Sequence, residues 1–216
     1  MRSWALDNSL IIRVFLAGPL SIWKVPMVEF HDIRFMRMAL EEAHKGALIG
    51  EVPIGAVLVL GGEVLARNHN RCLTERDPTA HAEILVIREA AKRLNNYRLL
   101  GSKLFVTVEP CAMCVGAMIQ ARISRLVFGI HEEKTGMVES RLTLLNYPFC
   151  NHQIEAVAGV LAEECRQLVQ RFFREKRKRT DQPHSFPPDR GRVSREVGRS
   201  NSQAKQTGLG EVPKWP

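Results

Sequence analysis

Two short stretches decide how this chain is interpreted: Thr-Ala-His-Ala-Glu at residues 79–83 and Glu-Pro-Cys-Ala-Met-Cys at residues 109–114. Each stands where a loop or a strand end is expected to meet the start of a helix. Cys111 and Cys114 are three residues apart, so in a first helical turn both sulfurs face the same side. The N-terminus of a helix also lowers the pKa of a thiol and favours the thiolate that a metal ion needs.

These stretches predict a metal site held by His81, Cys111 and Cys114. Three protein ligands leave one tetrahedral position open, which is typical of catalytic zinc. Glu83 follows His81 by two residues, and a carboxylate there can pass protons from zinc-bound water to a substrate. Taken alone, Cys-x-x-Cys also fits two core thiols or a redox pair, and His-x-Glu also fits a helix cap. Both motifs together, in this order and with a strand between them, favour the catalytic site.

Hydrophobic periodicity extends the prediction outward from the two stretches. Gly61-Gly62 predicts a hairpin, and residues 68–78 form a polar loop. Strands that alternate with helices in the second half predict parallel pairing, with helices packed on the sheet. The expected helices cover 32–48, 80–93, 111–121 and 160–177, and the expected strands cover 54–60, 63–67, 103–108, 125–129 and about 154–157.

The composition is that of an ordinary globular chain, with 45% hydrophobic and 25% charged residues among 216. It excludes collagen-like, wholly disordered and membrane-embedded proteins. The net charge of +8 is uneven, because residues 171–216 hold 12 Lys and Arg against 5 Asp and Glu. The basic run at 174–179 fits an RNA contact or a solvated helix end equally well. Five cysteines cannot pair completely, and we expect no disulfide-linked partner.

The chain resembles the bacterial tRNA-specific adenosine deaminases over roughly residues 28–176. Zinc nucleobase deaminases in general share the His-x-Glu and Pro-Cys-x-x-Cys motifs. The further matches make the resemblance specific to this family, because they occur in the family's order. They are 51–57 (EVPIGAV), 70–71 (NR), 77–84 (DPTAHAEI), 96–99 (NYRL), 107–114 (TVEPCAMC), 116–119 (GAMI), 127–129 (VFG), 134–136 (KTG), 151–152 (NH) and 172–174 (FFR).

The resemblance implies an α/β protein with the three-layer α-β-α cytidine-deaminase-like fold, in which helices flank a central five-stranded mixed sheet. It implies a cytoplasmic homodimer with one Zn²⁺ per subunit. The implied reaction is hydrolytic deamination of adenosine to inosine at the wobble position (34) of a tRNA anticodon, typically that of an arginine tRNA. Carried over, His81, Cys111 and Cys114 hold the zinc, and Glu83 shuttles protons.

The resemblance also implies contacts with the tRNA anticodon stem-loop. Asn70 matches the family residue that touches the target nucleotide, although a turn residue would fit the same loop. Phe172, Phe173 and Arg174 match the end of the helix that meets the stem-loop, and Phe172 fits plain core equally well. Glu132 stands where the family pattern often has Asp, so the detailed contact to the neighbouring nucleotide does not carry over.

We expect three segments along the chain. Residues 1–26 are an N-terminal extension, either not translated or disordered, because Met27 opens the first segment with regular periodicity. Residues 27–177 form the zinc-dependent deaminase domain. Residues 178–216 are a basic tail, rich in Pro, Gly and Ser, that has too few apolar residues to build a core and is expected to be disordered.

Two other functions fit the same motifs. One is a deaminase of a free base or nucleoside, which would have the same fold and zinc site. The other is a zinc-stabilised RNA-binding module without catalysis. The loop matches and the basic last helix favour a tRNA substrate over a free nucleoside, and Glu83 favours an enzyme over a binding module.

Overall fold

The computed structural model describes residues 28–148 and 150–180. The predicted N-terminal extension, residues 1–26, lies outside the described residues, and so does the predicted tail beyond residue 180. Both metal-site motifs lie within the described part of the chain.

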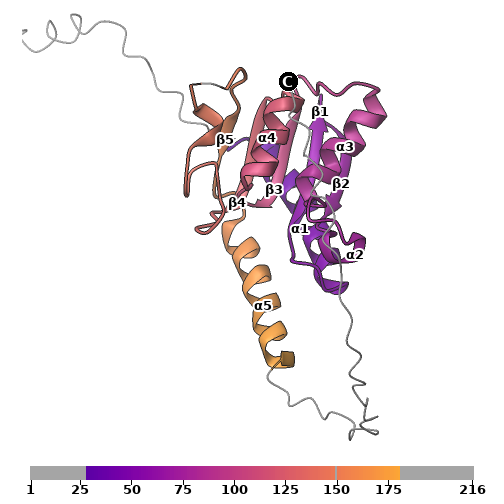
Figure 1. Cartoon of the computed structure of the whole chain (residues 1–216), viewed down its shortest axis with the longest axis vertical. Helices are drawn as coiled ribbons and strands as arrows, with labels where there is room; N and C mark the ends of the chain where they lie inside the picture. The colour runs from indigo at the N-terminus through magenta and orange to yellow at the C-terminus, as the bar shows by residue number, and fades with distance from the viewer. Residues whose placement is uncertain (1–27, 149, 181–216) are drawn as a thin grey trace, which may run out of the picture. The chain divides into compact units, whose positions relative to one another are not determined.

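The centre of the fold is a five-stranded mixed sheet with the order β2-β1-β3-β4-β5 (Figure 1). β1 pairs antiparallel with β2 and β3, whereas β3–β4 and β4–β5 pair in parallel. The predicted five-stranded mixed sheet is thereby confirmed, including the parallel pairing of its second half. The strands are β1 (Gly55–Leu60), β2 (Glu63–His69), β3 (Lys103–Val108), β4 (Arg125–Ile130) and β5 (Glu155–Val157).

Helices cover both faces of this sheet, which confirms the three-layer prediction. One face packs against α3 and α4, where Leu58 and Leu104 are fully buried. The other packs against α1 and α5, where Val57 and Phe105 are fully buried. Burial on both faces explains why the inner strands are continuous apolar runs. The helices are α1 (Phe30–Leu48), α2 (Cys72–Glu75), α3 (Ala82–Leu94), α4 (Ala112–Ala121) and α5 (Ala162–Thr180), with a 3₁₀ turn η2 (Leu144–Asn146).

The prediction that residues 68–78 form a loop was wrong in two details. β2 continues to His69, and the short helix α2 occupies Cys72–Glu75. Glu51 holds this helix, because its Oε1 accepts hydrogen bonds from the backbone N–H of Thr74 at 2.7 Å and from the Thr74 hydroxyl at 2.8 Å. A four-residue helix fixed by a carboxylate 23 residues earlier in the chain leaves no periodic pattern in the sequence.

None of the described helices is both long enough and apolar enough to cross a membrane. All five cysteines lie in the described part of the chain and none is paired in a disulfide.

Candidate metal and catalytic site

The two sequence motifs meet where α3 and α4 begin. His81 is the N-cap residue of α3 and Cys111 is the N-cap residue of α4, both with extended backbone. Cys114 follows within the first turn of α4. The two helices pack against the same face of the sheet, which brings together groups about thirty residues apart in the chain.

The three predicted ligands form a compact triangle of donor atoms. The Cys111 and Cys114 sulfurs are 3.7 Å apart, and His81 Nδ1 lies 3.7 Å from Cys111 Sγ and 3.5 Å from Cys114 Sγ. Tetrahedral zinc with ordinary Zn–S and Zn–N bonds requires about 3.8 Å between two sulfurs and about 3.6 Å between sulfur and nitrogen. The donor types and their spacing therefore fit three corners of a zinc tetrahedron, and this is the one such cluster found in the described residues.

The thiols influence each other strongly. Contact with the Cys114 thiol, followed by contact with His81, lowers the pKa of Cys111 to about 3 against the opposing effect of burial. Contact with Cys111 and burial raise the pKa of Cys114. Contact with Cys111 also raises the pKa of His81. The direction of the Cys111 shift favours a thiolate beside the imidazole, which is the form of cysteine that binds a metal ion.

Glu83 lies in the first turn of α3, beside the triangle. It is 3% exposed, and its Oε2 has no hydrogen-bond partner within the described segment. Burial raises the pKa of Glu83, opposed by its own backbone and by the nearby His81. A buried carboxyl oxygen left without a partner normally indicates a group that acts on a ligand or a water.

Asn70 follows β2 directly and borders the same helix start. Its Oδ1 accepts a hydrogen bond from the backbone N–H of Ala82 at 2.9 Å, and its own backbone N–H donates to the Ile54 carbonyl at 3.0 Å. Among the described residues nothing accepts a hydrogen bond from its Nδ2. Asn70 therefore satisfies one N–H at the start of α3 and keeps a donor to spare.

Glu109 is a residue whose role the motifs did not reveal. Its carboxylate accepts hydrogen bonds from the backbone N–H groups of Glu132, Val138, Glu139 and Ser140, at 2.8–3.0 Å, and from the Ser140 hydroxyl. Burial alone would raise its pKa, but these donors hold the pKa at about 2. Two residues before Cys111, Glu109 thus fastens the loop after β4 to the metal motif.

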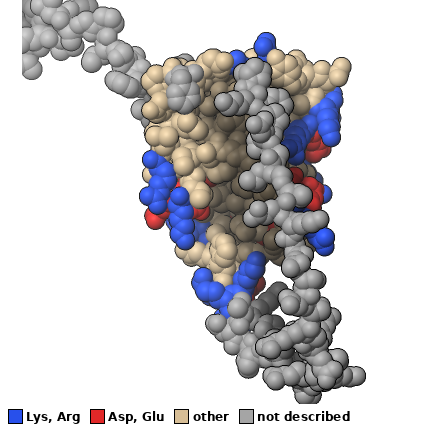
Figure 2. Space-filling model, viewed as in Figure 1, with Lys and Arg blue, Asp and Glu red and all other residues tan. Residues whose placement is uncertain are grey.

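Phe172, Phe173 and Arg174 lie on α5, a different element from those that carry the triangle. The two phenyl rings meet edge to face with their centroids 5.4 Å apart, and Phe173 remains 39% exposed. Arg174 lines a surface groove of about 590 Å³ with Phe173, Lys134, Val169, Gln170 and Arg177. Figure 2 shows Lys and Arg side chains gathered over the lower end of α5.

Comparison with known proteins gives concordant matches. Residues 30–177 match the family model described as MafB19-like deaminase. The chain is 49% identical over 148 residues to the tRNA-specific adenosine deaminase of Bacillus subtilis, covering 68% of this chain and 92% of that protein. It is 48% identical over 147 residues to the Haemophilus influenzae protein of the same name, covering 68% and 85%. The chain belongs to the tRNA-specific adenosine deaminase family.

Solved structures agree with this family assignment. A structure from a study of A-to-I editing by tRNA:A34 deaminases covers 62% of this chain and 98% of that chain, with 46% identity and a TM-score of 0.61. A guanine deaminase from Nitrosomonas europaea, at 22% identity and a TM-score of 0.55, covers 65% and 83% and shows the shared fold only. The tRNA-specific adenosine deaminases are enzymes, so the binding-module alternative does not fit the family.

Proposed function

We propose that this chain hydrolyses adenosine to inosine at position 34, the wobble position, of a tRNA anticodon. The observation that carries the proposal is the juxtaposition of the His81–Cys111–Cys114 triangle with a buried Glu83 oxygen that has no partner among the described residues. A relative at 49% identity bears the name tRNA-specific adenosine deaminase, and a 46% identical structure comes from a study of tRNA:A34 deaminases. Both support the tRNA substrate over a free nucleoside.

The metal in this proposal is one Zn²⁺ per subunit, held by His81 Nδ1 and the sulfurs of Cys111 and Cys114. Zinc held by three protein ligands lowers the pKa of a bound water to about 7 and makes it nucleophilic. Two thiols and an imidazole also favour zinc over the hard, oxygen-seeking Mg²⁺ and Ca²⁺.

Glu83 is the proton carrier. The net reaction consumes adenosine and one water and releases inosine and ammonia. The Glu83 carboxylate takes one proton from the attacking water and delivers it to N1 of adenine. It then takes the proton of the new hydroxyl on C6 and delivers it to the amino group, which leaves as ammonia while C6 becomes the carbonyl of inosine. Its unpartnered Oε2 is free for this exchange, and its burial keeps bulk water from competing.

In this proposal, Asn70 and residues of α5 bind the substrate. The Nδ2 group of Asn70 donates a hydrogen bond to the flipped-out base, while its Oδ1 stays on Ala82. Phe172, Phe173 and Arg174 meet the anticodon stem-loop, the aromatic residues by stacking and the arginine through phosphate. An unpaired loop base costs less to extrude than a duplex base, which suits an anticodon target.

The remaining parts of the proposal come from family resemblance. They are a homodimer, a cytoplasmic location and an arginine tRNA as the substrate.

Substrate class is tested by offering the purified protein two kinds of substrate. One is an anticodon stem-loop with adenosine at position 34, and the other is free adenosine, cytidine or guanine at matched concentration. We expect inosine to form in the stem-loop and little turnover of the free adenosine, cytidine or guanine. Rapid turnover of a free base or nucleoside beside an untouched stem-loop would replace this proposal with the nucleoside-deaminase alternative.

A further inference from the structure

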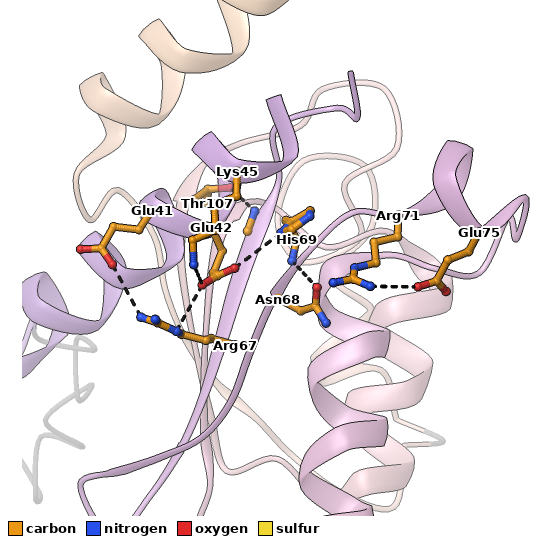
Figure 3. Close-up of polar contacts among 10 residues, drawn as sticks. Glu41, Glu42, Lys45, Arg67, Asn68, His69, Arg71, Glu75 and Thr107 are labelled. Carbon is orange, nitrogen blue, oxygen red and sulfur yellow. Dashed lines mark hydrogen bonds and ion pairs between the residues drawn. The ribbon is translucent and has the colours of Figure 1, made fainter. Parts of the chain in front are cut away.

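His69, the last residue of β2, is buried against α1 although its neighbour Asn70 faces the site. His69 is 8% exposed as a residue, and its Nδ1 lies 3.5 Å from Glu42 Oε2 (Figure 3). A carboxylate can only accept, so Nδ1 carries the proton in this contact. At 3.5 Å this is a long hydrogen bond, but little water reaches it, because the Glu42 side chain is also buried.

The α1 surface is shaped to receive this ring. Gly46 lies one helical turn after Glu42, and a Cβ on Gly46 would stand 3.2 Å from the His69 ring. Nearby, Gly55 is paired with His69 across β1 and β2, and a Cβ there would clash with the Ala39 carbonyl oxygen. The backbones of α1 and β1 therefore lie in direct contact at this point, and the close packing restricts where the His69 ring can lie.

The second carboxylate oxygen of Glu42, Oε1, is bound by two basic side chains. This oxygen accepts from Lys45 at 2.7 Å and pairs with Arg67 Nε at 3.2 Å, and Arg67 also lies 3.6 Å from Glu41 (Figure 3). These partners leave Oε2 directed at His69. The carboxylate is thus a fixed acceptor.

The chain then passes directly from this anchor to the site. Asn70 donates to the Ile54 carbonyl and accepts from the Ala82 N–H, and Arg71 N–H donates to the Ala80 carbonyl at 2.9 Å. Thus the residues on either side of His81 are hydrogen-bonded to the two residues that follow His69. A shift of His69 would move Asn70 relative to the start of α3.

We propose that the Glu42–His69 contact is a positioning device that holds Asn70 against the start of α3. His69 and Glu42 touch neither metal nor substrate and act only through Asn70. The effect on catalysis rests on the proposed function of Asn70, whereas the effect on the Asn70–Ala82 hydrogen bond does not. The two can therefore be measured separately.

The first measurement is amide hydrogen exchange at Ala82 in the zinc-loaded protein. His69→Phe keeps a ring on Gly46 and removes the donor, and Glu42→Met removes the acceptor and keeps His69. We expect either change to speed Ala82 exchange about tenfold, as loss of one anchoring hydrogen bond allows. Lys45→Met is the matched control, because it removes a partner of Glu42 Oε1 and leaves the His69 contact; exchange should then stay at the wild-type rate.

The second measurement is a double-mutant cycle on stem-loop deamination. His69→Phe should lower kcat/KM about three- to tenfold in the wild-type background and less than about twofold when Asn70 is already Ala. Equal losses in both backgrounds, or an unchanged Ala82 exchange rate in both His69→Phe and Glu42→Met, would overturn the inference. An inactive wild-type protein whose Ala82 exchange still responds to His69→Phe would instead overturn the proposed function and leave the positioning role supported.

Discussion

Ser140 donates both its backbone N–H and its hydroxyl to the carboxylate of Glu109, 31 residues earlier in the chain. Together with three further backbone N–H groups, this makes Glu109 the fastening point of the loop after β4. The loop also reaches the metal motif by a bridge between Gly136 and Cys111. The position of Cys111 is therefore coupled to a loop that contributes no ligand.

Glu109→Gln should destabilise the protein by about 2–4 kcal/mol, because an amide offers one acceptor oxygen and turns an N–H toward the loop's own donors. Chemical denaturation measures this loss. Glu139→Gln is the control, since that side chain forms an exposed pair with His131 and its removal should cost less than about 1 kcal/mol. Equal stability of the two variants would show that Glu109 does not fasten the loop.

Gly136→Ala should also destabilise, by about 1–3 kcal/mol, because of steric crowding. A Cβ at this position would lie 2.5 Å from the Glu109 carboxyl group and 2.6 Å from the Glu132 carbonyl. Thermal unfolding of this variant can be compared with that of Gly116→Ala, where a Cβ meets nothing within 4 Å. The Gly116 change lies within a helix and should be neutral or slightly stabilising. A wild-type melting temperature for Gly136→Ala would contradict the close approach.

Asp32→Asn should cost about 2–4 kcal/mol, because it removes the buried carboxylate that pairs with the Arg125 guanidinium and leaves only the partly exposed carboxylates of Glu29 at 3.6 Å and Glu155 at 3.5 Å. Arg125 donates to the two oxygens of Asp32 at 2.8 and 3.0 Å, and both residues are at most 4% exposed. This pair ties the first turn of α1 to the start of β4. The exposed Glu163–Arg166 pair is the comparison, and Glu163→Gln should change unfolding free energy by less than about 1 kcal/mol. Similar costs for the two changes would mean that Asp32 and Arg125 do not form a stabilising pair.

Glu51 should give the protein acid-sensitive stability. Burial would raise its pKa, but hydrogen bonds from the Thr74 N–H and hydroxyl outweigh it and lower the pKa below 4.5. The stabilisation is therefore complete above about pH 4.5 and fades as pH falls through the lower folded-state pKa. In urea unfolding, wild type should exceed Glu51→Gln in stability at about pH 7, and the gap should narrow below about pH 4.5. A gap that widens on acidification would contradict the assignment.

The sequence predicted the metal triangle and the sheet, because both depend on local patterns. His-x-Glu and Cys-x-x-Cys each place their side chains within one helical turn, and strands of apolar residues such as those of β3 and β4 are recognisable without any partner. α2 and the roles of Glu51 and Glu109 were not predictable. The helix α2 and the two glutamate roles depend on hydrogen bonds between groups that are 23 to 31 positions apart in the chain. The geometry of these hydrogen bonds exists only once the sheet has formed.

The histidines illustrate the same limit. Sequence spacing offered no partner for His69, His131 or His152. In the structure they lie beside Glu42, beside Glu139 at 2.9 Å, and beside the Ile123 carbonyl at 2.6 Å. Two of these partners are distant in the chain, and a main-chain carbonyl carries no sequence signature at all. Only His81 was identifiable, because its neighbours Ala82 and Glu83 complete a motif.

Glu83 is expected to carry the protons of a deamination on tRNA, and every step of the proposed reaction depends on this role. The most direct test is to measure inosine at position 34 in tRNA treated with wild-type protein and with Glu83→Gln, together with zinc content and tRNA affinity. We expect about one zinc per chain in both proteins, similar tRNA affinity, and inosine with wild type only. Inosine formation by Glu83→Gln at the wild-type rate, with zinc retained, would contradict the role of Glu83.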